Sequence, residues 1–557
     1  MPTPSCKDRS NFTPFDIVEE IWRSLDLPPK ALSSLSLPGT DNYGGTTGQI
    51  GPVVPSSFKV GHLAQASIAL SALGAALVCA ERDRSRELLG EEGKRDVESG
   101  LLKMPKTTVP LRSAILEFHA ERLYTLSDRP PVSIWGPIGG LHPTSDGFVK
   151  IHDNFEHHRR GVLELLGLDP GCEDRESVSD ATRKWDSKEL ERVAVEERGL
   201  CVYALRSFEE WDRVAEDWGR DRKGGPVRIR RVESDSESRA RPTPPNLRAS
   251  SFPPDKIQKT YLPTRRCLNG LRVVELSRVI AAPCAGKTLT AHGSDTLWVT
   301  SPNLPDLPAL DVEFSRGKRE RLMSLIKGAD VFIQSYRPGT LTGSKFGLGP
   351  ERLAGIRPGI VVGNLSAFAD RGSGKGENES LRNGAGVSDW SKRRGFDSLI
   401  QTCTGLNVAE AQAAGEGKSA RPLPCQALDH AAGFFLAFGI CAAVYLQKRD
   451  LAEERRIGEH RKVAGAYVVD VSLEGIADYL KSLGQFPGRS GFEGMNWGTI
   501  EDREEENGAV NEYFGKGMTP WGEMRFVKHA ASIEGFEVSW ERMPGKLGKD
   551  EAIWLER

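Results

Sequence analysis

The sequence predicts an α/β protein organised around a parallel sheet, and two observations lead to this fold class. The chain has 557 residues, more than the roughly 250–300 that one hydrophobic core accommodates, so at least two domains are expected. From residue 268 onward, short apolar stretches typical of buried strands alternate with helical stretches. Parallel strands need such helical crossovers, and proteins built this way bind ligands at the carboxyl ends of their strands.

The elements of this sheet follow in chain order. The first strand is expected at 271–276, within "LNGLRVVELSRVIAAP", and a helix follows in "AGKTLTAHG". Three further strands are expected in "SDTLWVT", "ADVFIQSY" and "GIVVGNLSAF". Each is short, rich in Val, Ile or Leu, and bounded by Gly, Pro or polar residues, which is the pattern of a buried strand.

An apolar segment at 431–446 predicts a helix buried in a protein core. It is sixteen residues long, whereas a membrane span needs about 20. Pro422 and Pro424 end the preceding structure, and Asp429 stands just before the apolar residues. Asp is a favoured N-cap because its carboxylate accepts hydrogen bonds from free backbone N–H groups. The pattern alone therefore favours a helix cap at Asp429 over a catalytic group.

Composition narrows the classes of partner. The net charge of −2 and the isoelectric point near 6.6 give no sign of binding to nucleic acid or to an anionic membrane. The first residues, "MPTPSCKDRSNFTPFD", lack the basic and apolar regions of a secretory signal. Nine cysteines occur without a C-x-x-C pair, which indicates a reducing compartment. A cytoplasmic location is expected, with an organelle as the alternative.

Two motifs resemble ligand sites without completing them. His152, His157 and His158 have no matching carboxylate or thiol spacing, so we expect no metal site there. "AAPCAGKT" carries Ala281 in place of the first glycine of a P-loop, and Pro283 removes one N–H donor. No G-x-G-x-x-G follows the first strand either, which argues against a dinucleotide fold of the usual kind.

Polar stretches divide the chain into parts. Residues 228–255, "RIRRVESDSESRARPTPPNLRASSFPPD", are rich in charge, Ser and Pro and predict a linker. We therefore expect an N-terminal part at 1–255 and a second part at 256–557 with its core at 268–480. The Gly-rich, polar segment 370–394 is expected to be an inserted surface loop.

The N-terminal part contains a modest repeat of the second part. "LAQASIALSALGAALVCAERD" at 63–83 matches "LDHAAGFFLAFGICAAVYLQKRD" when Gly74 is laid on Gly439, and "VPLRSA" at 109–114 echoes "VSLEGI" at 471–476. In this register Ala64 lies opposite Asp429. The N-terminal copy therefore lacks the carboxylate, and Ala64→Asp is expected to leave any turnover unchanged.

Six ordered segments of the second part resemble the class III CoA-transferase (CaiB/BaiF) family. They are "LNGLRVVELSRVIAAP", "SRGKR", "ADVFIQSYRPGTL", "FGLGPERLAGIRPGIVVGNLSAF", "RRGFDSLIQTCTGL" and "PCQALDHAAGFFLAFGICAAV". Upstream, "PTSDGFVKIHDNFEHHRRGVLELLGL" with "SFEEWDRV" resembles the family's smaller domain, and "MPGKLGKDEAIW" resembles its C-terminal segment. The resemblance implies a Rossmann-like CoA-binding domain with a smaller α/β domain, here in a rearranged form with a degenerate N-terminal half-repeat.

The resemblance also implies a reaction and a site. CoA would move from an acyl-CoA donor to a small carboxylic acid, with CoA as a substrate and no metal. Asp429, four residues before Gly433, matches the nucleophile of the family, which carries CoA as an aspartyl-CoA thioester. The resemblance places the CoA-binding residues at Arg278, Val279, Ile280, Ala281, Ser335, Tyr336 and Arg394.

Two other functions stay open. Racemases of 2-methylacyl-CoA in this family use a His and an Asp, but Phe396 stands at the His position here, while His430 lies beside Asp429. A homologue that binds CoA without catalysis is the second alternative, because the stretch after Arg319 is shorter than the family pattern and lacks a strand. Family members form interlocked dimers, so either a homodimer or an internal pseudo-dimer is expected.

Overall fold

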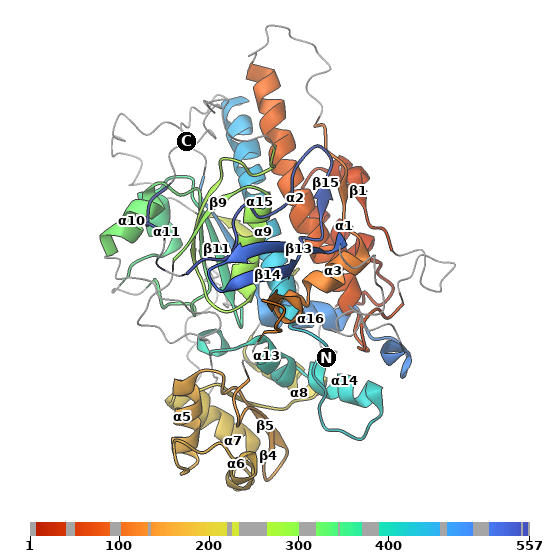
Figure 1. Ribbon diagram of the computed structural model, residues 1–557, viewed down its shortest axis with the longest axis vertical. Coiled ribbons are helices and arrows are strands. Elements are labelled where there is room, and N and C mark those ends of the chain that lie inside the picture. Colours follow the sequence, from red (N-terminus) through yellow and green to blue (C-terminus); the bar gives the residue numbers. More distant parts are fainter. Residues whose placement is uncertain are drawn as a thin grey trace.

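The computed structural model describes residues 7–39, 51–89, 102–131, 135–219, 225–232, 265–299, 319–342, 346–369, 389–456, 465–493, 512–546, 548 and 550–554. Its centre is a six-stranded sheet with the order β7-β12-β11-β10-β8-β9 (Figure 1). Five neighbouring strands are parallel: β8 (Arg272–Leu276), β9 (Asp295–Trp298), β10 (Val331–Gln334), β11 (Val361–Ser366) and β12 (Tyr467–Ser472). The four strands expected from the sequence are present, and the α/β prediction with a parallel sheet is confirmed.

The sheet ends in an antiparallel strand that the sequence did not predict. β7 (Arg228–Arg231) pairs with β12, and Ile229 lies opposite Val469. The linker predicted at 228–255 is therefore wrong at its start, because pairing with β12 orders residues that read as polar linker, while 233–255 lies outside the described residues. Arginines suit this position, since charged side chains on an edge strand discourage pairing with another chain.

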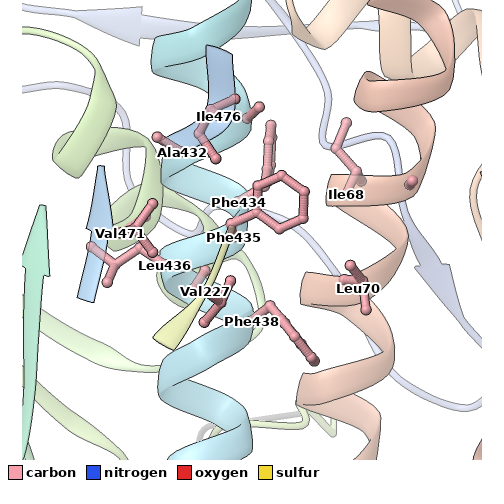
Figure 2. Close-up of a cluster of buried hydrophobic side chains, with 14 of the residues drawn as sticks. Ile68, Leu70, Val227, Ala432, Phe434, Phe435, Leu436, Phe438, Val471 and Ile476 are labelled. Carbon is pink, nitrogen blue, oxygen red and sulfur yellow. The ribbon is translucent and has the colours of Figure 1, made fainter. Parts of the chain in front are cut away.

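Two long apolar helices form the centre of the core. α15 (Ala427–Arg456) packs on one face of the sheet, and α2 (Val60–Leu89) packs along α15 (Figure 1). Both are long and apolar enough to cross a membrane, yet the apolar window of each is completely buried within the protein. Figure 2 shows Phe434 and Phe438 of α15 directed toward α2, which carries Ile68 and Leu70. The buried helix predicted at 431–446 is confirmed.

The two copies of the predicted repeat have the same order of elements. β1 (Leu35–Ser36), α2, β2 (Thr107–Thr108) and α3 (Leu111–Glu117) occur in this order in the N-terminal part, and β1 is parallel to β2. β11, α15, β12 and α16 (Leu473–Ser482) occur in this order in the second part, and β11 is parallel to β12. The packing is not symmetric. A Cβ on Gly74 would lie 3.1 Å from the Cβ of Cys441 in α15, whereas one on Gly439 would meet Val469 and Val227.

A smaller α/β unit lies within 135–219. Its antiparallel strands are β4 (Gly140–Pro143), β5 (Phe148–Ile151) and β6 (Val202–Ala204). Its helices are α5 (Glu156–Leu165), α6 (Arg175–Thr182) and α7 (Ser187–Arg192), which continues into the π-helical turn η3 (Val193–Glu197). Val149 and Ile151 of the sheet pack against Val162 and Leu163 of α5 in a separate hydrophobic core.

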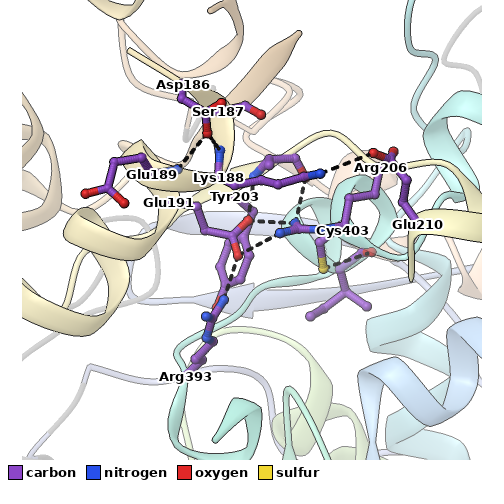
Figure 3. A network of polar contacts seen from close by, with 12 residues as sticks. Asp186, Ser187, Lys188, Glu189, Glu191, Tyr203, Arg206, Glu210, Arg393 and Cys403 are labelled. Atoms are coloured by element: carbon purple, nitrogen blue, oxygen red, sulfur yellow. Dashed lines mark hydrogen bonds and ion pairs between the residues drawn. The ribbon is translucent and has the colours of Figure 1, made fainter. Parts of the chain in front are cut away.

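A buried ion network joins this unit to the end of the segment predicted as a surface loop. Glu191 of α7 lies between Arg206 and Arg393, with a contact of 2.6 Å to each guanidinium group (Figure 3). The Arg393 guanidinium also lies 3.8 Å from the ring centroid of Trp390, in the turn η5 (Trp390–Lys392). The surface-loop prediction is therefore wrong for the end of 370–394, because these side chains are packed, while 370–388 lies outside the described residues.

Strands from both sides of the expected boundary at residue 255 share three sheets. Besides β7 with β12, β15 (Ser532–Ile533) pairs with β2, and β14 (Gly522–Val527) pairs with β3 (Thr125–Leu126) and with β13 (Phe514–Thr519). The boundary itself lies outside the described residues.

The remaining helices are α1 (Pro14–Ser24), η1 (Pro29–Ser34), α4 (Ala120–Leu123), α8 (Phe208–Asp217), α9 (Ala281–Ala291), α10 (Arg319–Lys327), α11 (Pro350–Ile356), α13 (Asp397–Cys403), α14 (Leu406–Ala414) and η6 (Ser490–Phe492).

Candidate functional site

Asp429 is the third residue of α15 and does not cap that helix. The carboxylate of Asp397, the first residue of α13, accepts hydrogen bonds from the amides of Leu428 at 2.8 Å and Asp429 at 3.0 Å. The side chain of Gln401 donates to the other oxygen of Asp397. The prediction that Asp429 is the N-cap is therefore wrong, because the buried carboxylate of Asp397 accepts the hydrogen bonds from the first amides of α15. The side chain of Asp429 is left available for chemistry.

The two carboxyl groups are buried next to each other, which changes their protonation. Asp397 is 1% exposed and Asp429 is 8% exposed. Burial raises the pKa of Asp397 to about 6, although the amides of Asp429 and Leu428 and the side chain of Gln401 oppose the rise. Burial and the negative charge of Asp397 raise the pKa of Asp429 well above its usual range. Since Asp397 accepts amide hydrogen bonds and Asp429 does not, we assign the more easily ionised group to Asp397.

A buried ion pair lies beside Asp429. The Nε2 atom of His430 is 2.9 Å from Oε2 of Glu121, which comes from α4 in the N-terminal part of the chain. The His430 ring also stacks on Phe118, with 5.4 Å between ring centroids. Burial alone would lower the pKa of His430, but the charge of Glu121, the neighbouring Cys284 side chain and the hydrogen bond that the ring donates to Glu121 raise it to about 10. His430 is therefore an imidazolium at neutral pH, and its positive charge is adjacent to Asp429.

The loop after β8 reaches α15 through a glycine contact. Residues 278–281 span the end of the connection from β8 and the first residue of α9, Ala281, and Val279 has a φ of 69°, a left-handed conformation that strains a β-branched residue. A Cβ on Gly433 would lie 2.5 Å from the carbonyl oxygen of Ala281 and 2.5 Å from the Cβ of Cys284. Glycine at 433 thus allows the start of α9 to touch α15 one turn after Asp429. The structure brings the predicted loop and the predicted nucleophile together.

A second glycine explains why this loop resembles a P-loop. A Cβ on Gly286 in α9 would overlap the carboxylate of Glu275, which is the fourth residue of β8. Glu275 is 2% exposed and accepts a hydrogen bond from Ser277. Burial raises the pKa of Glu275 to about 7, although the Ser277 hydrogen bond opposes this rise. Gly286 is therefore explained by the close approach of the buried Glu275 side chain, and no bound phosphate is needed to explain it.

Ser335 and Tyr336 lie at the carboxyl end of β10, next to the end of β8. The amide of Ser335 donates to the carbonyl of Leu276 at 3.1 Å, and the amide of Tyr336 donates to the side chain of Gln334 at 2.8 Å. The carboxyl ends of adjacent parallel strands are where ligands bind in open α/β sheets. Both residues therefore share the edge of the sheet with the loop after β8.

Three arginines gather near the start of α5, and sequence reasoning missed one of them. Nη1 of Arg394 is 2.9 Å from Nε2 of His158. The pKa of His158 is lowered to about 2, first by burial, then by the charge of His157, and further by the charges of Arg394 and Arg278. Burial and the charge of Arg394 lower the pKa of Arg337. We call Arg278, Arg337 and Arg394 the arginine cluster. Arg337 follows Tyr336 directly, and its charge in a loop after a strand was the signal that could have identified it.

The smaller α/β unit contributes side chains to the same region. Phe396 stacks on His152, with ring centroids 4.0 Å apart and an angle of 9° between the planes. Burial and the charge of Lys150 lower the pKa of His152 to about 3, so its imidazole is neutral. Lys150 of β5 also interacts with Asp397 through charge, and burial lowers its own pKa. Within the described residues, no group of three or more His, Cys, Asp or Glu side chains could hold a metal ion.

Comparison with known proteins gives one matching family. Residues 268–454 match the family model for CoA-transferase family III. The acetyl-coenzyme A transferase nodX of Hypoxylon pulicicidum is 26% identical over 63% of this chain and 55% of that protein. An acyl-CoA transferase of Gibberella moniliformis is 29% identical over 37% of each chain. A CaiB/baiF CoA-transferase family protein of Caenorhabditis elegans, ZK892.4, is 26% identical over 33% of this chain and 51% of that protein.

The matched segment contains the elements that form the site. The chain spans between 37% and 55% of the length of these relatives. The segment 268–454 includes β8, α9, β10, β11, α13 and the apolar part of α15. It therefore carries Asp397, Asp429 and the loop after β8. Residues 268–454 are thus similar to CoA-transferase family III, and a protein of the CaiB/BaiF family is among the relatives of this chain.

Proposed function

We propose that this chain is an enzyme that transfers CoA from an acyl-CoA donor to a carboxylic acid through an aspartyl-CoA intermediate on Asp429. One observation carries the proposal. Asp429 is a nearly buried carboxylate whose helix is already capped by Asp397, and it lies one turn before the contact of Gly433 with the start of α9. A buried carboxylate that the fold does not need as a cap is a candidate for chemistry.

The reaction proceeds by two pairs of exchanges. The Asp429 carboxylate attacks the carbonyl carbon of the donor thioester, which forms a mixed anhydride and releases the CoA thiolate. The thiolate attacks the aspartyl carbonyl, which gives aspartyl-CoA and releases the donor acid as a carboxylate. The acceptor carboxylate then attacks aspartyl-CoA, and the returning thiolate attacks the acceptor carbonyl. These last steps form the new acyl-CoA and regenerate Asp429.

The electrostatics of the site support a carboxylate nucleophile. The raised pKa of Asp429 makes its carboxylate more basic than an ordinary one, and basicity increases nucleophilic reactivity once the group is ionised. The imidazolium of His430 supplies the opposite charge that favours this ionised form. Asp397 fixes the amides of residues 428 and 429, so the backbone that carries the nucleophile is held in one position.

We assign CoA binding to the edge of the sheet at β8 and β10. The loop 278–281, Ser335 and Tyr336 lie there, and the arginine cluster adds three guanidinium groups. Arginine suits this role because its planar fork pairs with phosphate oxygens, and CoA carries phosphate groups at its nucleotide end. The substrates proposed are an acyl-CoA and a small carboxylic acid. The N-terminal part supplies Glu121 to the site, which favours an internal pseudo-dimer over a simple appendage.

A 2-methylacyl-CoA racemase is the second candidate, and one observation favours it. Phe396 cannot exchange a proton, but the neutral imidazole of His152 stacks directly on its ring. A racemase needs an acid or base on each face of the α-carbon. His152 would be the replacement for the missing histidine, with Asp429 on the other face.

The proposed function is tested by supplying acetyl-CoA with a panel of short mono- and dicarboxylic acids and detecting the new acyl-CoA by mass spectrometry. Wild-type protein should form at least one new thioester, and Asp429→Asn should form none. Asp153→Asn is the matched control, because Asp153 is also buried and accepts an amide hydrogen bond from Ile138, in the smaller unit. Equal transfer by wild type and Asp429→Asn would refute the proposal.

A further inference from the structure

Lys150 brings a cation to the site that the proposed reaction does not use. It is the third residue of β5, the middle strand of the antiparallel sheet in the smaller unit. Its side chain is half-buried, and its ammonium group makes no hydrogen bond or ion pair with the residues that the structure describes. An ammonium group has three N–H donors, and burying a charge costs free energy unless the charge is paired. Lys150 therefore has donors available for a ligand.

Strand pairing shows which face of this small sheet carries Lys150. Its neighbours in the strand, Val149 and Ile151, are buried in the separate core of the smaller unit. Because side chains alternate along a strand, Lys150 and His152 lie on the opposite face. Lys150 is paired with Tyr203 of β6, so the Tyr203 side chain lies on that face as well.

This face of the sheet covers the start of α13, where Asp397 lies. The Tyr203 hydroxyl donates a hydrogen bond to the carbonyl oxygen of Arg394, and His152 stacks on Phe396 with 4.0 Å between ring centroids. Arg394 and Phe396 closely precede Asp397 in the chain. Burial lowers the pKa of the Lys150 ammonium, and the charge of Asp397 opposes that effect. Lys150 therefore belongs to the same corner of the protein as the two buried carboxyl groups.

The Lys150 ammonium is not needed to satisfy the hydrogen bonds of Asp397. One carboxylate oxygen of Asp397 accepts from the amides of Leu428 and Asp429, and the other oxygen accepts from the Gln401 side chain. Both oxygens thus have partners within the described residues. Lys150 adds a positive charge near this carboxylate and keeps its own N–H donors.

A carboxylate of the acid substrate is the group that fits these donors. In the proposed reaction, one carboxylate of the acid reacts at Asp429, where the acting charges are those of Asp397, His430 and Glu121. Lys150 interacts through charge with Asp397 instead, so a carboxylate bound by Lys150 is a different group from the reacting one. The charge of Asp397 would repel such a group, and the ammonium offsets this repulsion. The phosphate groups of CoA are already assigned to the arginine cluster.

We propose that Lys150 binds the second carboxylate of a dicarboxylic acid and thereby selects dicarboxylic over monocarboxylic acids. This inference rests on the proposed function, because it names the class of acid that receives CoA at Asp429. The acid would bind with one carboxylate at Asp429 and the other at Lys150, and only the first would become a thioester. A monocarboxylic acid would leave the ammonium unpaired, and this difference would separate the two classes of acid.

The first test compares straight-chain dicarboxylates, from malonate to glutarate, with monocarboxylates of equal length as acceptors from acetyl-CoA. In the full chain, kcat/KM should be higher for the best dicarboxylate than for its matched monocarboxylate. Lys150→Met and Lys150→Gln, which both remove the charge, should lower this ratio by about tenfold or more, mainly through the KM of the dicarboxylate. Lys150→Arg keeps the charge and should retain part of the preference.

Lys188→Met is the matched control for these variants. Lys188 belongs to α7 in the same unit, and 62% of its side chain is exposed. Its substitution removes a charge of the same type away from the site, so the ratio should not change. Circular dichroism and thermal unfolding check the fold of every variant.

A binding measurement makes the inference independent of turnover. Calorimetric titration of Asp429→Asn with the same acids, with CoA present, should show binding of a dicarboxylate. Asp429→Asn/Lys150→Met should bind that dicarboxylate about tenfold or more weakly. The proposed transfer is read separately, because it fails if Asp429→Asn still transfers CoA.

Three results would overturn the inference. One is an unchanged preference for the dicarboxylate in the folded Lys150→Met and Lys150→Gln variants. Another is an equal loss for both classes of acid, which would indicate a structural role for Lys150. The third is the absence of dicarboxylate binding to Asp429→Asn.

Discussion

The carboxylate of Asp397 accepts a 3.0 Å hydrogen bond from the backbone amide of Asp429. The residue proposed as nucleophile is thus held by a second buried carboxylate, which also raises the pKa of Asp429 by charge after the larger effect of burial. One contact therefore links the local geometry of α15 to the protonation of Asp429. A change at Asp397 should alter stability and catalysis together.

Asp397→Ala should lower the free energy of unfolding by about 1–3 kcal/mol, because two buried amides lose their acceptor. It should also reduce CoA transfer, since the first turn of α15 is no longer fixed. Asp397→Asn keeps an oxygen acceptor and should recover most of the stability. The measurements are urea unfolding and the rate of transfer.

Asp174→Ala is the matched control for this prediction. Asp174 caps α6 by accepting from the amides of Glu176 and Ser177 at 3.1 and 3.0 Å, in the smaller unit. Its loss should reduce stability through the same type of contact without reducing the transfer rate per folded molecule. If Asp397→Ala behaved like this control, the proposed role of Asp397 in positioning the nucleophile would be wrong.

Glu121→Gln should lower the pKa of His430, because the neutral amide no longer favours the imidazolium. In wild type the folded pKa of about 10 lies above the usual value of 6.5. The ion pair therefore stabilises the fold fully below pH 6.5, and this contribution is lost as the pH rises through about 10. A titration of His430 by NMR with labelled histidine, assigned with His430→Gln, measures the shift. An unchanged titration would show that Glu121 does not control the charge.

Glu275→Gln should stabilise the protein at pH 8 relative to wild type and have little effect at pH 5. The folded pKa of Glu275 is about 7, above the unfolded value of 4.5. Its favourable contribution is therefore complete below pH 4.5 and is lost as the pH rises through about 7. The difference between the two proteins at pH 8 should approach about 3 kcal/mol. Glu176→Gln, on the exposed first turn of α6, should show no such pH dependence in the same unfolding experiment.

A single-enantiomer 2-methylacyl-CoA in deuterated water should gain no α-deuterium at a catalytic rate. Phe396 leaves one face of the α-carbon without a proton donor of its own. Mass spectrometry of the recovered thioester measures the exchange. Rapid exchange that disappears in His152→Gln would support the racemase instead and identify His152 as the second acid or base.

Removal of residues 1–255 should give an insoluble fragment. The truncation deletes α2, which covers α15, and also β7, β2 and β3, which pair with strands of the second part (Figure 1). An apolar surface of more than a few hundred Å² would be exposed, and such patches promote association. Solubility and size-exclusion chromatography of the 256–557 fragment provide the measurement. A soluble, active fragment would mean that the N-terminal part is an independent appendage.

Local sequence patterns identified the elements that depend on local chemistry. The strands β8 to β11 could be placed because their Val, Ile and Leu residues are bounded by turn-forming residues. The helix at 431–446 could be placed because its residues are almost all apolar, but α15 extends beyond these sixteen residues and is long enough to cross a membrane, so its burial and not its length makes it a core helix. In contrast, β7 contains three arginines and resembled a linker, and only its pairing with β12 makes it a strand. Residues 228–231 form a strand because they pair with β12, and the local sequence contains no sign of that pairing.

Only part of the candidate site was predicted, because several of its contacts join residues that are far apart in the sequence. Asp429 and the loop 278–281 were identified from the family resemblance, whereas the cap of α15 comes from Asp397, 32 positions earlier. Glu121 reaches His430 from 309 positions away. Contacts over such separations depend on the tertiary fold. Ala64, which lies opposite Asp429 in the repeat, is fully buried in α2, and the effect of Ala64→Asp on turnover stays a prediction. The substitution would also bury an unpaired carboxylate and should therefore destabilise the protein, an effect that the local sequence did not indicate.

The most direct test of the account is to locate CoA on the protein after incubation with acetyl-CoA. Wild-type protein, digested and analysed by mass spectrometry, should carry CoA as a thioester on the peptide that contains Asp429. Hydroxylamine should convert that group to a hydroxamate, and Asp429→Asn should show neither product. CoA transfer to an acid without any adduct on Asp429, or with the adduct on another carboxylate, would contradict the assignment of Asp429 as the nucleophile.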